Sequence, residues 1–245
     1  MKRKITGAIF ALAVLGCVPF EANAVPVLQL DIAGGSYDNG TETIVTSSDT
    51  FTLYALLKPS TYNTLSDSYY ISAALTPQVS TSATLGSFVF NGATINATSD
   101  MFYGVPPLEA ILASDKGDLP THGVFPTYYK EFGFQFEAAN RIETYNSQDR
   151  AISGGAINTD YASNGGMYFA RFDIDVASLA PGYELHFDLY NTTLNSYSGD
   201  VDVTKFAPFS HDAETTSHSV PEPATLLLMG SGLTGLYFSR KLRRK

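Results

Sequence analysis

Apolar and polar residues alternate along several segments in the middle of the chain. In residues 28–32 the apolar side chains occupy every second position, and the same period runs through 131–137, 168–176 and 183–189. A period of two is typical of strands that bury one face. We therefore expect the apolar positions to be buried and the polar positions between them, such as Gln29 and Asp31, to face the other way. Leu28, Leu30 and Ile32 are expected to share one face of their strand. The residues expected to be buried are Phe132, Phe134, Phe136, Phe172, Ile174, Leu185, Phe187 and Leu189.

Further strands are expected at 51–57, 69–75 and 85–90, where the alternation is less regular. A Pro181-Gly182 pair reverses the chain between 168–176 and 183–189, so these two strands are predicted to form an antiparallel hairpin. Many short strands with one polar face favour an all-β fold, a single antiparallel β-sandwich over residues 25–210. Residues 107–113 are expected to form one or two helical turns.

The N-terminal segment has the three parts of a secretory signal peptide. Three cations (Lys2, Arg3, Lys4) precede an apolar run at 5–18, and Ala22-Asn23-Ala24 is a small-x-small site. The run is shorter than the roughly 20 residues that a spanning helix needs. We predict a signal peptide over 1–24, with Ala22 and Ala24 forming the cleavage site. The alternative is lipidation of Cys17, at the end of a loose lipoprotein pattern at 14–17.

Cysteine content and charge exclude several classes of function. Cys17 is the only cysteine, so cleavage after Ala24 leaves no thiol for disulfides, catalysis or zinc binding. The formal charge of the whole chain is −9, and without its two ends seven basic and 22 acidic residues remain, which gives −15. A domain of that charge repels nucleic acid and anionic lipid, so neither is an expected partner.

The C-terminal end has the order of a stop-transfer element. Pro221-Glu222-Pro223 precedes fifteen uncharged residues at 224–238, which are predicted to span the membrane. The two prolines hold Glu222 in extended backbone outside the apolar segment. A polar linker is expected at 211–220. The cations that end the membrane segment and stay in the cytoplasm are Arg240, Lys241, Arg243, Arg244 and Lys245.

Motif, apolar segment and basic end together resemble the PEP-CTERM sorting signal, here over residues 221–245. The resemblance implies that an exosortase recognises Pro221, Glu222 and Pro223 and removes the tail. It also implies a Gram-negative host, transient membrane anchoring and an association with exopolysaccharide. A plain single-pass anchor is the alternative.

Phrases within the domain resemble the choice-of-anchor N proteins. They begin at Val25, Thr50, Phe125 and Gly199 and read VPVLQLDIAGG, TFTLYALL, FPTYYKEF and GDVDVTKFAPFSHDAE. This resemblance implies an extracellular domain displayed on the cell surface, and no established activity.

Catalytic motifs do not stand out. The Gly-Ser-Gly at 230–232 falls in the predicted membrane segment, and there is no phosphate-binding loop or His-Glu-x-x-His. We predict that the protein is not an enzyme and that it has no catalytic residue or metal site. His211, Asp212 and Glu214 are interpreted as part of the polar linker, and His186 as a surface residue on the polar face of its strand.

Three acidic clusters, 38–40, 115–118 and 200–202, could supply oxygen ligands to calcium, but each is also an ordinary turn. No cofactor is therefore expected, with calcium as the alternative. The pairs Tyr69-Tyr70 and Tyr128-Tyr129 put one ring on each face of a strand, so one ring of each pair is expected to be exposed.

The favoured function is a non-catalytic surface or extracellular-matrix protein. The alternatives are a carbohydrate-binding module and a secreted hydrolase of unknown substrate.

Overall fold

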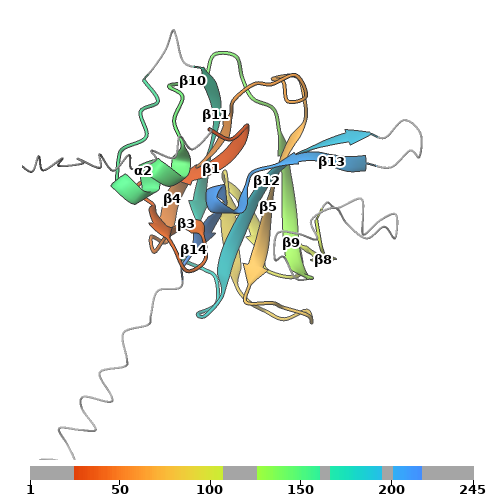
Figure 1. Ribbon diagram of the computed structural model, residues 1–245. Coiled ribbons are helices and arrows are strands. Elements are labelled where there is room, and N and C mark those ends of the chain that lie inside the picture. The colour runs from red at the N-terminus through yellow and green to blue at the C-terminus, as the bar shows by residue number, and fades with distance from the viewer. Residues whose placement is uncertain (1–24, 107–125, 161–165, 195–200, 217–245) are drawn as a thin grey trace, which may run out of the picture.

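The structure is a computed structural model that describes residues 25–106, 126–160, 166–194 and 201–216. It is mostly β, with 48% strand and 6% helix, which confirms the prediction of a mostly-β fold. The strands form two sheets whose pairings are antiparallel except for one parallel pair, β14 with β3. Figure 1 shows these sheets with a short helix, α2, at one side.

Sheet A has six strands and sheet B has eight. The order in sheet A is β1 (Leu28–Ile32), β4 (Thr50–Leu57), β11 (Met167–Asp175), β6 (Ser87–Phe90) and β7 (Ala93–Asn96), with β10 (Arg141–Ile142) paired to β11. The order in sheet B is β2 (Ser36–Asp38), β3 (Thr43–Thr46), β14 (Ala213–Thr215), β12 (Glu184–Leu194), β5 (Tyr69–Thr76), β9 (Thr127–Phe134) and β8 (Phe102–Gly104), with β13 (Val201–Phe206) paired to β12. The helices among the described residues are α2 (Ser147–Ser153) and the 3-10 turn η1 (Phe209–His211).

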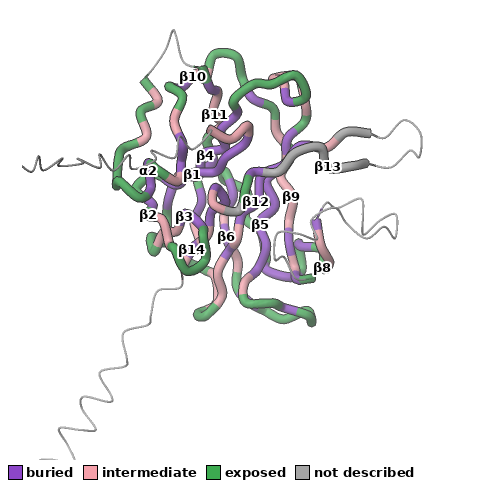
Figure 2. The backbone as a smooth tube through the Cα atoms, viewed as in Figure 1, coloured by how far each residue is buried: buried purple, intermediate pink, exposed green. Residues whose placement is uncertain are grey.

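The main core lies between the two sheets. Apolar side chains of β1, β4 and β11 join those of β5 and β12 in one buried cluster. Rings meet across the sheets: the centroids of Phe51 and Phe187 are 6.2 Å apart, and those of Phe134 and Phe172 are 5.1 Å apart. In Figure 2 buried segments follow the strands and exposed ones follow the loops. This packing is what a β-sandwich requires.

Most of the expected core residues are buried, and two are only half-buried. Phe132 and Phe134 lie on β9, whose one flank is covered only by the three-residue strand β8. Both still pack against the core, and the ring of Phe132 stacks on that of Phe90 with centroids 3.7 Å apart. Alternation thus predicted the face of each side chain, while the degree of burial depends on the neighbouring strand.

The polar face of β1 is also buried, because the segment around α2 covers it. Gln29 and Asp31 are fully buried. The carboxylate of Asp31 accepts hydrogen bonds from Nε of Arg150 at 2.9 Å and from the hydroxyl of Tyr145 at 3.0 Å, and it also contacts Nη2 of Arg150. Burial raises the pKa of Asp31 to about 6, an effect that its bonds to Arg150 and Tyr145 partly offset.

The predicted hairpin of 168–176 with 183–189 is wrong. The first segment is β11 of sheet A and the second is β12 of sheet B, so the turn at 181–182 carries the chain from one sheet to the other. Both flanks of each strand are already paired: β11 has β4 on one flank and β6 and β10 on the other, and β12 lies between β5 and β14. Local turn chemistry cannot specify which sheet accepts the returning strand.

Residues 211–215 belong to the folded domain, so the prediction of a linker starting at residue 211 is wrong for this part. β14 lies between β3 and β12, and His211, Asp212 and Ala213 are buried.

The predicted helical turn at 107–113, the signal peptide and the sorting tail lie outside the described residues. Within the part of the chain that is described, no helix has the length and apolarity needed to cross a membrane.

Candidate functional site

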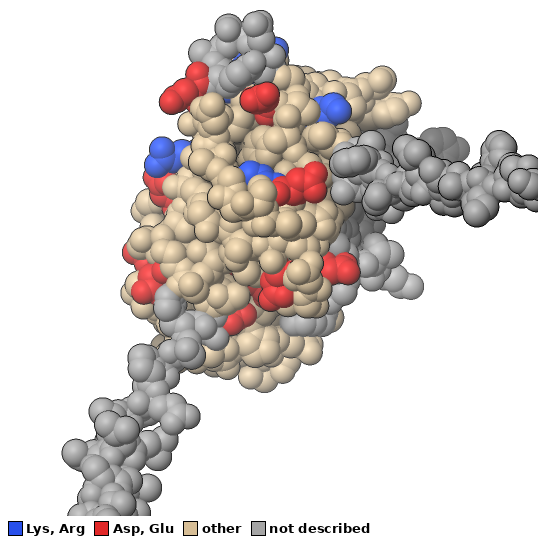
Figure 3. Space-filling view, turned by 60° about the vertical axis from the view of Figure 1, so that its left-hand side comes forward, with Lys and Arg blue, Asp and Glu red and all other residues tan. Residues whose placement is uncertain are grey.

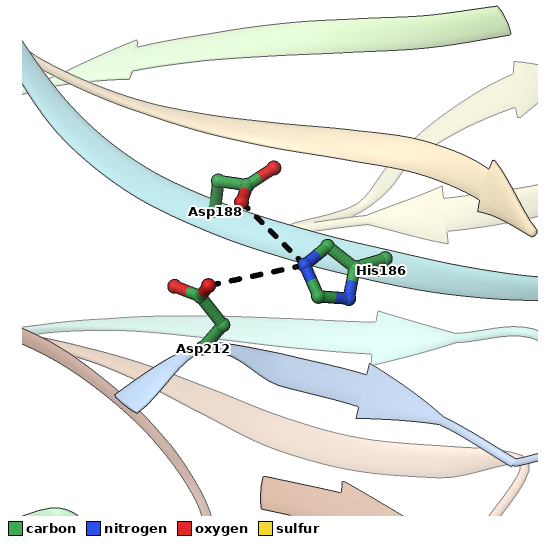
Figure 4. A group of neighbouring side chains, drawn as sticks. All are labelled: His186, Asp188 and Asp212. Carbon is green, nitrogen blue, oxygen red and sulfur yellow. Dashed lines mark ion pairs between the residues drawn. The ribbon is translucent and has the colours of Figure 1, made fainter. Parts of the chain in front are cut away.

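Four ionisable side chains gather on the outer face of sheet B. His186 and Asp188 lie on β12, Glu214 lies on β14, and Asp212 directly precedes β14. We refer to these four residues as the His186 cluster. Figure 4 shows one ring nitrogen of His186 facing the carboxylates of both Asp188 and Asp212.

Strand geometry explains why these residues meet. Because Leu185, Phe187 and Leu189 point into the core, the residues between them on β12 must point outward on one common face. β14 pairs with β12 in a register that puts Glu214 opposite His186. Residues 186 and 214 are distant in sequence but are neighbours across one pair of strands.

The side chains are close together and largely withdrawn from solvent. Nε2 of His186 lies 3.5 Å from Oδ1 of Asp188 and 4.0 Å from Oδ2 of Asp212, and Nδ1 lies 3.9 Å from Oε2 of Glu214. The exposed fractions are 14% for His186, 2% for Asp188, 1% for Asp212 and 13% for Glu214. The cluster therefore places three carboxylates around one imidazole in a site with limited access to water.

Neighbouring hydroxyl groups hold two of the carboxylates. The hydroxyl of Ser72 on β5 donates to Oδ2 of Asp188 at 2.9 Å, and that of Thr76 donates to Oε1 of Glu214 at 3.1 Å. Burial disfavours the charged imidazolium, but the surrounding carboxylates outweigh this effect and raise the pKa of His186 well above its ordinary value. The arrangement is suited to binding a cation, either a proton on the imidazole or a metal ion.

The sequence-based interpretations of four residues in this region are wrong. His186 is largely buried, and Asp212 and Glu214 are not in a linker. His211 is not in a linker either, because it is buried and contacts Asn146. The alternation in 183–189 does place His186 and Asp188 on one face of the strand. This pattern is the part of the cluster that the sequence could predict. The pairing of β14 beside them could not be inferred from local pattern.

The acidic clusters considered for calcium are not supported by the described residues. In 38–40, Oδ1 of Asp38 accepts a hydrogen bond from the backbone N–H of Gly40 at 2.7 Å, as in an ordinary turn. The cluster at 115–118 lies outside the described residues, as does residue 200 of the third cluster.

The tyrosine pairs differ slightly from expectation. Tyr69 and Tyr129 are fully buried, whereas Tyr70 and Tyr128 are half-buried where exposed rings were expected. Tyr70 stacks on Tyr190 at 6.0 Å, and Tyr128 packs beside Tyr103 at 5.5 Å. These contacts remove part of each ring from solvent.

One shallow hollow with a volume of about 400 Å³ lies over sheet A and carries Asp173 and Asp175. Glycoside hydrolysis pairs one ionised carboxylate with one whose pKa is raised. The Asp173 carboxylate instead accepts hydrogen bonds from Arg171, which lower its pKa. The hollow is shallow and not a deep pocket, so it does not favour the hydrolase alternative.

The C-terminal segment of the chain matches a known protein family. Residues 219–244 match the family model described as the PEP-CTERM protein-sorting motif. The chain carries a PEP-CTERM sorting motif. The match covers the predicted Pro-Glu-Pro element and nearly all of the apolar and basic segments behind it. It indicates an exported protein that is processed by an exosortase at the cell envelope. No catalytic family is found, and the choice-of-anchor N subtype stays a prediction.

No curated protein matches this sequence. Among solved structures, the C-terminal domain of the Streptococcus pyogenes antigen I/II-family protein AspA is similar over 79% of this chain, with 11% sequence identity and a TM-score of 0.22. This chain spans 54% of that structure. A likeness of this size supports no inference about fold or function.

Proposed function

We propose that this protein is a non-catalytic component of the cell surface or extracellular matrix of a Gram-negative bacterium. The signal peptide at 1–24 exports it, the apolar segment at 224–238 holds it in the membrane, and an exosortase then removes the tail at Pro221-Glu222-Pro223. The released domain joins the exopolysaccharide layer. The match of residues 219–244 to the sorting motif is the observation that carries this proposal.

The surface of the domain fits a location outside the cell and away from polyanions. Figure 3 shows acidic side chains scattered over one face, with fewer basic ones among them. With seven basic and 22 acidic residues between the two ends, the domain repels nucleic acid and anionic membranes. A high net charge also keeps a displayed domain soluble.

Replacing Glu222 tests whether the motif is recognised. Insertion into the membrane depends on the apolar segment and the cations, so Glu222→Ala should leave it intact. If the exosortase requires Glu222 for recognition, the Glu222→Ala variant accumulates in the membrane fraction at the mass of the uncut chain. Glu143→Ala, the same change at an exposed residue of the domain, should be processed like the wild type. Equal mass and partition of the Glu222→Ala and wild-type proteins would support a plain anchor instead.

A carbohydrate-binding role is the second candidate, and exposed rings on the edge strand β8 favour it. Tyr103 is 43% exposed and Phe102 is 38% exposed, and Nζ of Lys130 lies 5.9 Å from the Phe102 ring centroid. Exposed amphipathic rings provide contact area for a ligand with both apolar and polar groups, such as a sugar. Retention on immobilised host polysaccharide should fall for Tyr103→Ala and stay unchanged for Tyr62→Ala, since Tyr62 is 78% exposed but lies in a turn and not on β8. Equal retention of both variants would remove this candidate.

A further inference from the structure

We propose that His186, Asp188 and Asp212 bind a divalent transition-metal ion, with Glu214 and Ser72 orienting two of the ligands. The donor atoms of the first three residues all lie within 4.8 Å of one another. They come from two elements of sheet B and converge on one point of its outer face (Figure 4). This site is independent of the sorting tail, because none of its residues lies in 219–244.

The separations of the donors suit one small ion. A metal with ligand distances of about 2.0–2.2 Å and tetrahedral geometry holds its donors roughly 3.4 Å apart. Nε2 of His186 is 3.5 Å from Oδ1 of Asp188 and 4.0 Å from Oδ2 of Asp212. Small rotations of the carboxylates bring the three atoms to these positions. Solvent supplies the remaining ligand through the 14% of His186 that is exposed.

Strand pairing fixes the backbone positions of two of the ligands. His186 and Asp188 are two residues apart on β12, which is paired along 184–191 with β5 and at residues 186 and 187 with β14. A central strand of a sheet is a rigid support, as a metal site requires. Asp212 precedes β14 by one residue, and the backbone N–H of Ile44 donates to its carbonyl oxygen at 3.0 Å. The third ligand is thus also anchored to the sheet.

Residues beside the three ligands hold them in position, as hydrogen-bonding neighbours of the ligands do in known metal sites. A metal-bound imidazole usually donates its other N–H to a carboxylate, and this bond fixes its tautomer. Oε2 of Glu214 lies 3.9 Å from Nδ1 of His186, on the side away from Asp188 and Asp212. Ser72 holds Oδ2 of Asp188 at 2.9 Å. Nε2 of His186 and Oδ1 of Asp188 are therefore the atoms directed toward the ion.

Charge also favours a divalent cation. Carboxylates held close together repel one another, and a cation between them reduces this repulsion. The His186 cluster contains three carboxylates and one imidazole, of which Asp188 and Asp212 are at most 2% exposed. A metal ion of charge +2 between them offsets much of the repulsion among the carboxylates.

The donor set selects a class of metal. Calcium takes six to eight oxygen ligands, whereas imidazole is a ligand for zinc, copper, iron and nickel. A site with one imidazole nitrogen and two carboxylates fits a divalent transition-metal ion better than calcium or magnesium. Zn²⁺ is the appropriate first probe because it accepts both nitrogen and oxygen ligands in a four-coordinate site.

Titration of the untagged, EDTA-treated full chain with ZnCl2 tests the site. Calorimetry should give one equivalent of Zn²⁺ per chain, and the thermal unfolding midpoint should rise with Zn²⁺ concentration because the ion binds the folded state. A hundredfold excess of Ca²⁺ should not displace it. Asp212→Asn preserves the shape of the side chain and should weaken Zn²⁺ binding at least tenfold. Glu214→Gln should weaken Zn²⁺ binding about 10–100-fold, the usual effect of losing a residue that orients a metal ligand.

Asp173→Asn is the matched control, since it removes an exposed carboxylate from sheet A and should leave Zn²⁺ affinity unchanged. If Asp212→Asn fails to fold, as judged by far-ultraviolet circular dichroism, Ser72→Ala is a milder change that should still weaken Zn²⁺ binding. Absence of Zn²⁺ binding by the wild type would overturn the proposal. So would equal Zn²⁺ affinity in the wild type and every folded cluster variant, and displacement by Ca²⁺ would overturn the assigned class of metal.

Discussion

Nε2 of His211 lies 3.0 Å from Oδ1 of Asn146, a residue 65 positions earlier in the chain. Asn146 is the N-cap of α2, and the same Oδ1 accepts the backbone N–H of Asp149 at 3.1 Å. Because this oxygen can only accept, Nε2 of His211 must carry the proton. Nδ1 of His211 lies 2.8 Å from the Ser210 hydroxyl, which can donate to it. Neutral His211 thus satisfies both of its ring nitrogens while it ties η1 to α2.

This contact predicts that the stability contributed by neutral His211 is lost in acid, separately from the opposite contribution of Asp31, whose pKa is raised. Burial lowers the pKa of His211 from 6.5 to about 4. Between these two values the unfolded chain binds the proton at this residue and the folded chain does not, so the contribution of His211 falls as pH decreases from 6.5 toward 4. The full difference corresponds to about 3 kcal/mol. Urea unfolding of EDTA-treated protein between pH 7 and pH 4 measures it.

His211→Gln provides the comparison, because glutamine cannot titrate and other ionisable groups are shared by both proteins. The stability advantage of the wild type over His211→Gln should shrink as the pH falls. Parallel pH profiles for the two proteins would contradict the proposed role of His211.

Gly86 and Gly92 form a matched pair of backbone tests. Both have a left-handed conformation, with φ of +79° and +84°. A Cβ at Gly86 would lie 2.0 Å from the carbonyl oxygen of Ser178, whereas a Cβ at Gly92 would meet nothing within 4 Å. Gly92→Ala should cost about 1–2 kcal/mol for the backbone conformation alone. Gly86→Ala should cost roughly 1–3 kcal/mol more because of the clash. Equal unfolding midpoints in urea would show that the loop at Ser178 moves freely.

The sequence predicted the positions of the strands better than it predicted which elements pair with them or cover them. Alternation located β1, β11 and β12 and the inward direction of their apolar residues, because period two is a local property of a pleated strand. It did not predict that α2 covers Gln29 and Asp31, since a buried polar face and a solvated one have the same pattern. The short helix itself has no long apolar stripe.

The His186 cluster shows the same limit for a functional site. The spacing of His186 and Asp188 was visible, but Asp212 and Glu214 lie about 25 residues later in a stretch with the composition of a linker. The antiparallel pairing of β14 with β12 brings them together, and β3 pairs with the other flank of β14. Long-range pairing of this kind leaves no periodic signal in the sequence.

The cations at the end of the tail should act differently from Glu222. Positive residues beside an apolar segment keep that end of the segment in the cytoplasm. Replacing Arg243, Arg244 and Lys245 with Gln should weaken retention, so that uncut protein appears in the medium at the mass of the chain with its tail. Replacing Lys58 and Lys130 of the domain with Gln is the control and should leave retention unchanged. Normal retention and processing of the tail variant would show that the remaining cations, Arg240 and Lys241, suffice.

The ion pair of Arg150 with Asp31 should be among the most sensitive contacts of the domain. Nε of Arg150 donates to Asp31 at 2.9 Å, and Nη1 donates to the carbonyl oxygen of Gly35 at 2.9 Å. The side chains are 6% and 0% exposed, so removing one partner leaves the other charge buried without compensation. Arg150→Met should therefore cost about 3–5 kcal/mol in urea unfolding at pH 7.

A double-mutant cycle separates the pair from simple loss of packing. Asp31→Leu combined with Arg150→Met removes both charges, and it should be less destabilising than the sum of the two single changes, with a coupling of about 1–3 kcal/mol. Arg171→Met is the control, because the Arg171–Asp173 pair spans 3.0 Å but its side chains are 57% and 64% exposed. An exposed pair contributes at most about 1 kcal/mol, so this variant should unfold close to the wild type. An equal decrease in the free energy of unfolding for Arg150→Met and Arg171→Met would show that water reaches Asp31. It would also show that α2 does not shield the outer face of β1 from solvent.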